Sequence, residues 1–174
     1  TLTIALLLNA KIVDEVQIMR KTVVDGSNTT GFQRTALVAM DGFIETSKGV
    51  VKIPTICLEE EAAQKIEESS EYVRYNIDRL GIALIEIATD VSIKDPEHAK
   101  EAAAHIGMVL RSVEGVKRGL GTIRQDVNVS IKQGRRTEIK GFQELKSIPE
   151  VIKYEIKRQL ELIEEGKDLK PEVR

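Results

Sequence analysis

Hydrophobic and polar residues alternate along much of the chain, which is the pattern of strands with one buried face. Short segments rich in Gly, Ser, Asn and Thr separate these stretches, most clearly at residues 25–31. A turn at residues 78–81 predicts a hairpin between the strands on either side of it. The predicted strands are residues 12–24, 32–41, 49–59, 72–78, 81–88, 121–131 and 135–140.

Two stretches instead repeat apolar residues every three or four positions, as a helix with one buried face does. The first begins with Asp95 as N-cap and Pro96 in the first turn, and ends near Gly115. The second begins at Ser147, for which Glu150 completes a capping box. The two apolar stripes are Ala99, Ala102, Ala103, Ile106, Val109, Leu110 and Val113, then Ile148, Ile152, Ile156, Leu160 and Ile163.

Strands outnumber helices, and regular strand–helix alternation is absent. This favours an α+β fold with a mostly antiparallel sheet and helices packed on one face. The polar residues 60–70 predict a short helix or loop, and the apolar residues 1–10 a helix or strand. Pro54 predicts that its strand lies at an edge or is bulged at that point.

The composition limits the class of protein but does not indicate a function. The chain has 174 residues, of which 41% are hydrophobic and 31% charged, so it is long and apolar enough for one core. A net charge of −2 gives no global basic signature for nucleic acid, and the single Cys57 excludes an internal disulfide. No apolar run approaches a membrane span, so the cytoplasm is the default location. An apolar start and a polar end predict that these residues are part of a longer protein.

Standard catalytic and phosphate-binding motifs are absent. Residues 115–121 are glycine-rich and basic. They either cradle phosphate or form a helix end followed by a turn, and we favour the helix end and turn. His98 and His105 are seven positions apart on one predicted helix, which is not the spacing of a metal pair. We expect both histidines to be half-solvated.

Carboxylates inside predicted strands are the main chemical signal. Glu86 lies in an apolar strand, where a charge needs either an ion-pair partner or a ligand, and the local residues do not choose between them. Glu59, Asp126 and Glu138 lie in three other predicted strands. Four such acids on one sheet face would suit Mg²⁺, although residues 59–61 also read as a solvated acidic run. Residues 111–140 carry eight basic residues against three acidic ones, which suits a phosphorylated ligand or a plain hairpin rim.

Four segments, taken in order, resemble the GatB/GatE family of tRNA-dependent amidotransferase subunits, in its archaeal GatE branch. The bacterial and organellar B subunits are more distant. The segments are DEVQIMRKTVVDGSNTTGFQRTALVAMDGFI, CLEEEAAQKIEE, YNIDRLGIALIEIATD and GLGTIRQDVNVSIKQGRRTEIKGFQEL. The chain departs from the family pattern at Ala83, where the family has Pro, and at Val91-Ser92. The family's Gly-x-Glu-x-His strand, inserted domain and helical tail are not among these residues, so we expect part of the cradle-like catalytic domain.

The resemblance implies an ATP-dependent carbon–nitrogen ligase that acts in translation. With ATP and Mg²⁺ it would activate the γ-carboxyl group of Glu-tRNA(Gln), and ammonia from a partner amidase subunit, GatD-like in archaea, would complete Gln-tRNA(Gln). Carried over by position, Glu59 and Glu86 would hold the metal, and Asp126 and Glu138 would be further catalytic acids of that site. The implied nucleotide-binding and acceptor-end residues are Arg20, Lys21, Ser27, Thr29, Thr30 and Arg34. The alternatives are a B-type subunit, or a non-catalytic fragment that docks a partner subunit or tRNA.

Overall fold

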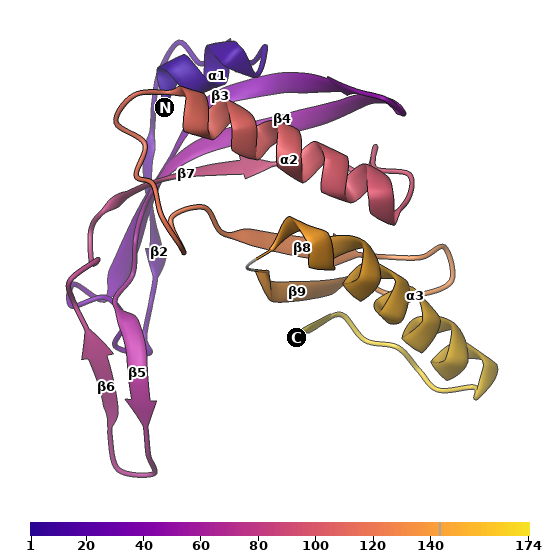
Figure 1. Ribbon diagram of the computed structural model, residues 1–174. Coiled ribbons are helices and arrows are strands. Elements are labelled where there is room, and N and C mark those ends of the chain that lie inside the picture. The colour runs from indigo at the N-terminus through magenta and orange to yellow at the C-terminus, as the bar shows by residue number, and fades with distance from the viewer. Residues whose placement is uncertain (143) are drawn as a thin grey trace. The chain divides into compact units, whose positions relative to one another are not determined.

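The computed structural model describes residues 1–142 and 144–174 (Figure 1). It divides into two compact units. The first contains Thr1–Phe43 and Lys52–Asp90, and the second contains Ile44–Val51 and Val91–Arg174. Both combine helices with mainly antiparallel sheets, which confirms the predicted α+β class.

The first unit is built on a five-stranded sheet in the order β1-β3-β4-β7, with β2 also paired to β3. Its apolar core comes from alternating positions of the long strands together with the first helix, and includes Ile4, Ala5, Leu8, Ala36, Val38, Ile53 and Ile56. The elements are α1 (Leu2–Leu7), β1 (Lys11–Ile12), β2 (Ile18–Thr22), β3 (Phe32–Thr46), β4 (Gly49–Glu60) and β7 (Ala83–Ala88).

The predicted strands 32–41 and 49–59 are confirmed as β3 and β4, whereas the single strand predicted at 12–24 is two short strands, β1 and β2. The β7 ladder on β4 begins at the pair Thr55–Ala88, one residue past Pro54. Pro54 therefore lies just outside that ladder, but β4 lies between β3 and β7, so the expectation that its strand is at an edge is wrong.

Residues 60–70 were expected to form a short helix or loop, and this prediction is wrong. Gln64–Glu68 is a strand, β5, paired antiparallel with β6, Val73–Asn76 (Figure 1). The predicted hairpin of residues 72–78 with 81–88 is also wrong, because β7 pairs with β4. All five β5 residues are exposed, so β5 has no buried face and its sequence shows no apolar alternation. Its strands are joined by cross-strand contacts such as the Arg74–Glu67 ion pair at 2.9 Å.

The second unit packs two helices against a three-stranded sheet in the order β10-β9-β8. β8 and β9 are antiparallel, as predicted, and β10 adds a parallel edge strand. The core lies between the helices and one sheet face and contains Ala99, Val129, Phe142, Ile148 and Ile152. The elements are α2 (Pro96–Ser112), β8 (Gln125–Val129), β9 (Thr137–Phe142), η1 (Leu145–Ser147), α3 (Ile148–Glu164) and β10 (Glu172–Val173).

The start of α2 is as predicted, since the Asp95 carboxylate accepts the His98 backbone N–H at 3.0 Å. The prediction of a capping box formed by Ser147 and Glu150 at the start of α3 is wrong. The turn η1 precedes that helix and places Ser147 in a helical conformation, where its hydroxyl donates to the Glu144 carbonyl at 2.8 Å instead. The 3₁₀ turn therefore replaces the side-chain cap.

The buried face of α3 becomes polar towards its end. Ile148 and Ile152 are buried as predicted, but Glu155 and Gln159 are buried next, while Leu160 remains 46% exposed. Gln159 donates to the Arg135 carbonyl at 3.0 Å and to the Thr137 hydroxyl at 3.2 Å. Hydrogen bonds to β9 therefore continue the packing that apolar contacts begin.

Candidate functional site

Glu59, Glu86 and Cys57 share one face of the β4–β7 ladder. Cys57 pairs with Glu86, and Glu59 pairs with Leu84 two positions away. Side chains two residues apart point to the same face, and such diagonal neighbours have Cα atoms about 7–8 Å apart. Burial raises the pKa of the Cys57 thiol, and the negative charges of Glu86 and Glu59 raise it further. Both carboxylates are therefore close enough to act on the same thiol.

Glu86 is exposed, and its side chain forms no hydrogen bond or ion pair with any residue that the structure describes. The expectation that it lies in a buried strand is wrong. β7 is the last strand on its side of the sheet, and Ala83 and Ala88 are exposed as well. Water can solvate this carboxylate, so it needs no internal partner. Of the two roles that the sequence left open for Glu86, the ion pair is therefore not formed in the described structure.

Glu59 differs from Glu86 because it has a basic neighbour. The Lys21 ammonium lies 3.5 Å from a Glu59 carboxylate oxygen, and the Glu59 side chain is 18% exposed. Lys21 therefore reaches the same face of the sheet as Glu59. The Lys21 side chain itself is 62% exposed, so it can turn from Glu59 towards a phosphate group.

Arg34 and Arg20 lie on the opposite sheet face from Lys21. Arg20 pairs with Arg34 across β2 and β3, while Lys21 pairs with the next residue along. Arg34 binds Glu60 through its guanidinium, with Nε 2.8 Å from Oε1, and through its backbone N–H. These hydrogen bonds lower the pKa of the Glu60 carboxyl group. The Arg20 guanidinium lies over the Phe32 ring, 5.1 Å from its centre.

The acidic run 59–61 is not simply a solvated surface. Glu59 faces Lys21, Glu60 faces Arg34, and the Glu61 carboxylate lies 4.0 Å from Arg79. Sequence reasoning missed Glu60 as a functional neighbour. The available signal was strand parity, which puts Glu60 on the face opposite Glu59 and therefore beside a different cation.

The loop 25–31 uses most of its hydroxyl groups internally. The Asp25 carboxylate accepts the Ser27 backbone N–H at 2.9 Å and the Ser27 hydroxyl at 2.6 Å, and these bonds lower the pKa of Asp25. The Thr30 hydroxyl donates to the Phe32 carbonyl at 3.0 Å. Thr29 is exposed. The expected ligand-binding hydroxyls of Ser27 and Thr30 are thus engaged in shaping the loop.

Asp126 and Glu138 belong to the second unit, on the sheet β10-β9-β8. The Lys140 ammonium bridges them, 3.1 Å from Asp126 and 2.9 Å from Glu138. Hydrogen bonds to Glu138 and Asp126 raise the pKa of Lys140. The four acids were expected on a single sheet face, but they lie on two different sheets in two units. The sequence could not reveal this, because alternation within a strand does not say which sheet the strand joins.

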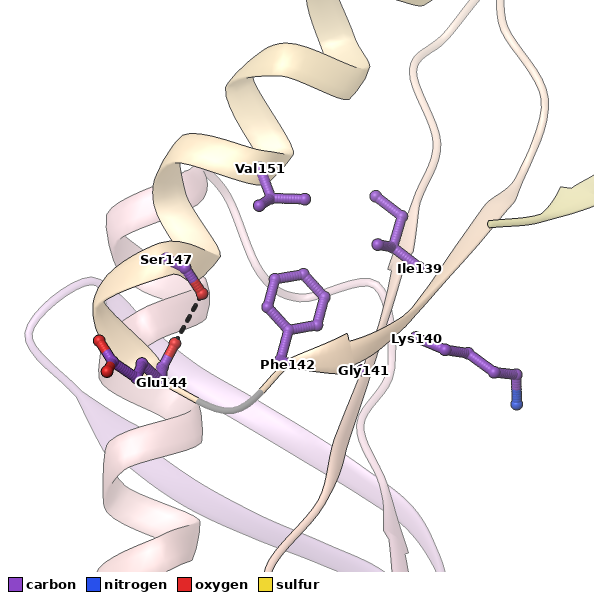
Figure 2. Close-up of a pocket in the computed structure, with 7 residues that line it drawn as sticks. All are labelled: Ile139, Lys140, Gly141, Phe142, Glu144, Ser147 and Val151. Atoms are coloured by element: carbon purple, nitrogen blue, oxygen red, sulfur yellow. Dashed lines mark hydrogen bonds between the residues drawn. The ribbon is translucent and has the colours of Figure 1, made fainter. Parts of the chain in front are cut away.

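A depression of about 360 Å³ lies where β9 ends and η1 and α3 begin (Figure 2). Figure 2 shows the Ile139, Phe142 and Val151 side chains facing one another across it, while the Lys140 side chain points away. A dashed line marks the hydrogen bond from the Ser147 hydroxyl to Glu144. Both apolar and polar residues line the depression, since Glu144 and Ser147 border it as well. The acids bridged by Lys140 lie on the other face of the sheet.

The histidines have no catalytic geometry, and His98 is not half-solvated as expected. It is fully buried, with Nδ1 accepting the Lys94 backbone N–H at 3.1 Å and Nε2 lying 2.8 Å from the Thr46 hydroxyl. That hydroxyl donates to a carbonyl, so His98 Nε2 carries the hydrogen. His105 is partly exposed. Residues 115–121 form a mostly exposed segment with turns after the end of α2, which agrees with the predicted helix end and turn.

The carboxylates of Glu59 and Glu86 could bind Mg²⁺ in one kind of arrangement. Among residues 1–142 and 144–174, no three His, Cys, Asp or Glu side chains gather closely enough to enclose a metal ion. Mg²⁺, however, is usually held by one or two carboxylates together with water and substrate phosphates. Glu59 and Glu86 supply two carboxylates on one sheet face. No ion-pair partner in the described structure has to leave the Glu86 carboxylate before a metal ion binds it. The donor set therefore fits Mg²⁺ bound jointly with a phosphorylated substrate.

Comparison with known proteins places these residues in a known group. The model of the GatB/GatE catalytic domain matches residues 1–174. The chain is 61% identical over 163 residues to the E subunit of the glutamyl-tRNA(Gln) amidotransferase of Methanosarcina barkeri, covering 94% of this chain and 26% of that protein. It is 62% identical over 162 residues to the corresponding E subunit of Pyrococcus abyssi, covering 93% and 26%. The chain spans about a quarter of the length of these relatives. No helix in the described part of the chain is long and apolar enough to cross a membrane.

Proposed function

Because this chain belongs to the GatB/GatE catalytic-domain family, we propose that it is the part of a glutamyl-tRNA(Gln) amidotransferase that activates the glutamate carried by tRNA(Gln). The observation that supports this best is the shared face of Glu59 and Glu86 on the β4–β7 ladder. It places two carboxylates on one face, of which Glu59 is paired with Lys21, in a chain that lacks an activated nucleophile motif. Phosphoryl transfer needs such an arrangement, since it depends on positioning and charge rather than on a protein nucleophile.

The reaction proceeds in two steps. A γ-carboxylate oxygen of the tRNA-bound glutamate attacks the γ-phosphorus of ATP, and the bond to ADP breaks. Ammonia then attacks the activated carbonyl carbon, phosphate leaves with the bonding electron pair, and loss of a proton gives the amide of Gln-tRNA(Gln). The first step brings anions together, so groups that neutralise charge control its rate.

The residues on this face have distinct roles in that step. Glu59 and Glu86 would hold Mg²⁺, which when bound neutralises phosphate charge. Lys21, 3.5 Å from Glu59, exchanges that carboxylate for a phosphate oxygen when ATP binds. Arg34 is held by Glu60 on the other face, so its role is to order the ends of β3 and β4 beneath the site.

Asp126 and Glu138 act as a second acidic group under the control of Lys140. Their shared ammonium holds both carboxylates in a fixed orientation. In this proposal ammonia comes from a partner amidase subunit, and the naming of the relatives as E subunits of an amidotransferase supports a heteromeric protein.

Replacing Glu86 tests the proposal in the complete protein with its partner subunit. We expect Glu86→Gln to reduce Gln-tRNA(Gln) formation by at least about a hundredfold, because the carboxylate charge is lost while the side-chain shape is kept. Ammonia release by the partner should continue. Electron paramagnetic resonance of Mn²⁺ with ATP should show weaker binding to the variant.

Glu97→Gln is the matched control, because Glu97 is an exposed carboxylate on α2 and faces Lys153 at 3.8 Å. It should retain full activity. Unchanged amidation by Glu86→Gln would exclude this metal site. If Glu86→Gln retained amidation but released the partner or the tRNA, the docking alternative would replace the catalytic one.

A further inference from the structure

Glu60, the last residue of β4, is held by two consecutive residues of the neighbouring strand β3. Its Oε1 atom accepts Nε–H of Arg34 at 2.8 Å and also lies 2.5 Å from the guanidinium nitrogen Nη2. Its Oε2 atom accepts the Arg34 backbone N–H at 3.1 Å. The side-chain amide of Gln33 donates to the Glu60 carbonyl at 2.5 Å. Both carboxylate oxygens and the backbone carbonyl of Glu60 are therefore tied to β3.

The contacts between Glu60 and Arg34 fix a direction more than they add stability. The Arg34 side chain is 58% exposed and that of Glu60 is 25% exposed, and ion pairs this open to water contribute little to the free energy of folding. A carboxylate that meets two guanidinium nitrogens with one oxygen and a backbone N–H with the other has, however, a single orientation. The end of β4 cannot twist away from β3 without breaking this set of hydrogen bonds.

Glu59 is the residue whose direction depends on this hold. Successive side chains of a strand point to opposite faces, so fixing Glu60 on one face fixes where the Glu59 side chain leaves the backbone on the other. The contact of the Glu59 carboxylate itself is looser, because its neighbour Lys21 is 3.5 Å away and 62% exposed. On the other side, β4 pairs only with β7, the last strand of the sheet. The hold of β3 on Glu60 is thus the firmer constraint on Glu59.

We propose that Glu60 is a positioning residue that, with Arg34 as its partner, aims the Glu59 carboxylate at the metal ion of the proposed reaction. The inference rests on the proposed function, in which Glu59 and Glu86 hold Mg²⁺. Glu60 lies on the opposite face of the sheet and so acts through Glu59. Arg34 in turn acts through Glu60 and is not a ligand of the nucleotide.

The test replaces each member of the pair in the complete protein with its partner subunit. Glu60→Ala removes the carboxylate, and Arg34→Met removes the guanidinium but keeps an unbranched side chain. Each should raise the Kd for Mn²⁺ in the presence of ATP about tenfold, as loss of a group that orients a metal ligand does, measured by electron paramagnetic resonance. The double variant should bind Mn²⁺ no more weakly than Glu60→Ala, because either change breaks the same pair. Arg34→Met also provides the test if Glu60→Ala does not fold.

Hydrogen exchange without metal or nucleotide gives a second readout that does not depend on activity. The amides of residues 57–60 should exchange about tenfold faster in Glu60→Ala, because the strand end has lost its hold on β3. Glu67→Ala is the matched control, since Glu67 also pairs with an arginine of a neighbouring strand, Arg74 at 2.9 Å, but in the β5–β6 ribbon. It should leave the Mn²⁺ affinity and the exchange of residues 57–60 unchanged.

Three results would overturn the proposal. Wild-type Mn²⁺ affinity in Glu60→Ala would do so even if exchange were faster, since the contacts would then only support the strand. An equal loss of affinity in Glu67→Ala would show that metal binding follows general stability. A higher KM for ATP in Arg34→Met, with a wild-type KM in Glu60→Ala, would make Arg34 a ligand of the nucleotide.

Failure of the proposed function gives a different pattern. If the wild-type complex binds no Mn²⁺ with ATP, or if Glu86→Gln leaves amidation unchanged, the metal site fails and this inference fails with it. If the wild type binds Mn²⁺ and Glu86→Gln abolishes amidation while Glu60→Ala binds Mn²⁺ normally, only this inference fails.

Discussion

The Glu155 carboxylate on α3 offers a direct measurement of what a buried ionised group contributes to this protein. It is 5% exposed and receives a bidentate contact from Arg158, with both nitrogens 2.8 Å from its oxygens. Gln159 Nε2 donates to it at 2.7 Å. Burial raises the pKa of Glu155, but hydrogen bonds from Arg158, Gln159 and Thr137 outweigh burial and lower the pKa to about 2.

The size of the effect follows from that pKa. A fall from 4.5 to about 2 corresponds to about 3 kcal/mol of folding free energy, at about 1.36 kcal/mol per unit. Because the folded pKa lies below the unfolded one, this stability is fully present above about pH 5. It is lost as the pH falls towards about 2. Glu155→Gln should therefore cost about 3 kcal/mol at neutral pH.

Urea unfolding of the wild type and of Glu155→Gln, from about pH 7 to about pH 3, measures this contribution. The difference between them should fall to less than half its neutral value by about pH 3, since below about pH 4.5 the carboxyl group of the unfolded chain takes up a proton that the folded protein does not. Glu161→Gln on the same helix is the control. That carboxylate is 58% exposed and 3.6 Å from Lys157, so its loss should cost less than about 0.5 kcal/mol.

Two results would refute this reasoning. A difference that stays constant from about pH 7 to about pH 3 would show that the substitution acts through packing rather than charge. A loss below about 0.5 kcal/mol at neutral pH would show that desolvation of Glu155 cancels its hydrogen bonds.

Three further predictions concern local contacts. Asp95→Ala should cost about 1 kcal/mol in urea unfolding, because α2 loses the cap on the His98 N–H; a wild-type midpoint would show that the cap is dispensable. His98→Leu should cost about 2 kcal/mol or more, since it orphans groups bonded to both ring nitrogens, whereas His105→Leu should change little; equal effects would contradict this. Arg34→Met should raise the pKa of Glu60 towards its ordinary value in an NMR titration, and an unchanged pKa would mean that Arg34 is not the cause.

Local patterns predicted the elements that have a buried face. The alternation in β3 and β4 follows from one side of each strand packing on the core, and Asp95-Pro96 marks the start of α2 because capping involves only neighbouring residues. The strands that local patterns missed are β5 and β10. β5 is exposed throughout, and both residues of β10 are exposed, so neither shows the pattern of a strand.

The tail illustrates the same limit. Residues 167–174 look like a polar extension, yet Glu172 and Val173 pair with Thr137 and Glu138 on β9. Arg158 bridges the buried Glu155 to Glu172 and so ties this strand to α3. Such a contact depends on two segments meeting in space, and no local periodicity encodes it.

The sequence by itself determined the α+β class, most strands, both long helices, and the strand positions of Glu59, Glu86, Asp126 and Glu138. It also determined which side chains share a face within one strand, because side-chain direction follows from backbone geometry alone. Only the tertiary structure decided that β7 pairs with β4, which brings Glu86 beside Cys57 and Glu59, and that Lys140 bridges the other two acids. Those pairings depend on hydrogen bonds between distant segments, and a shift of one residue in register would move every side chain to the opposite face.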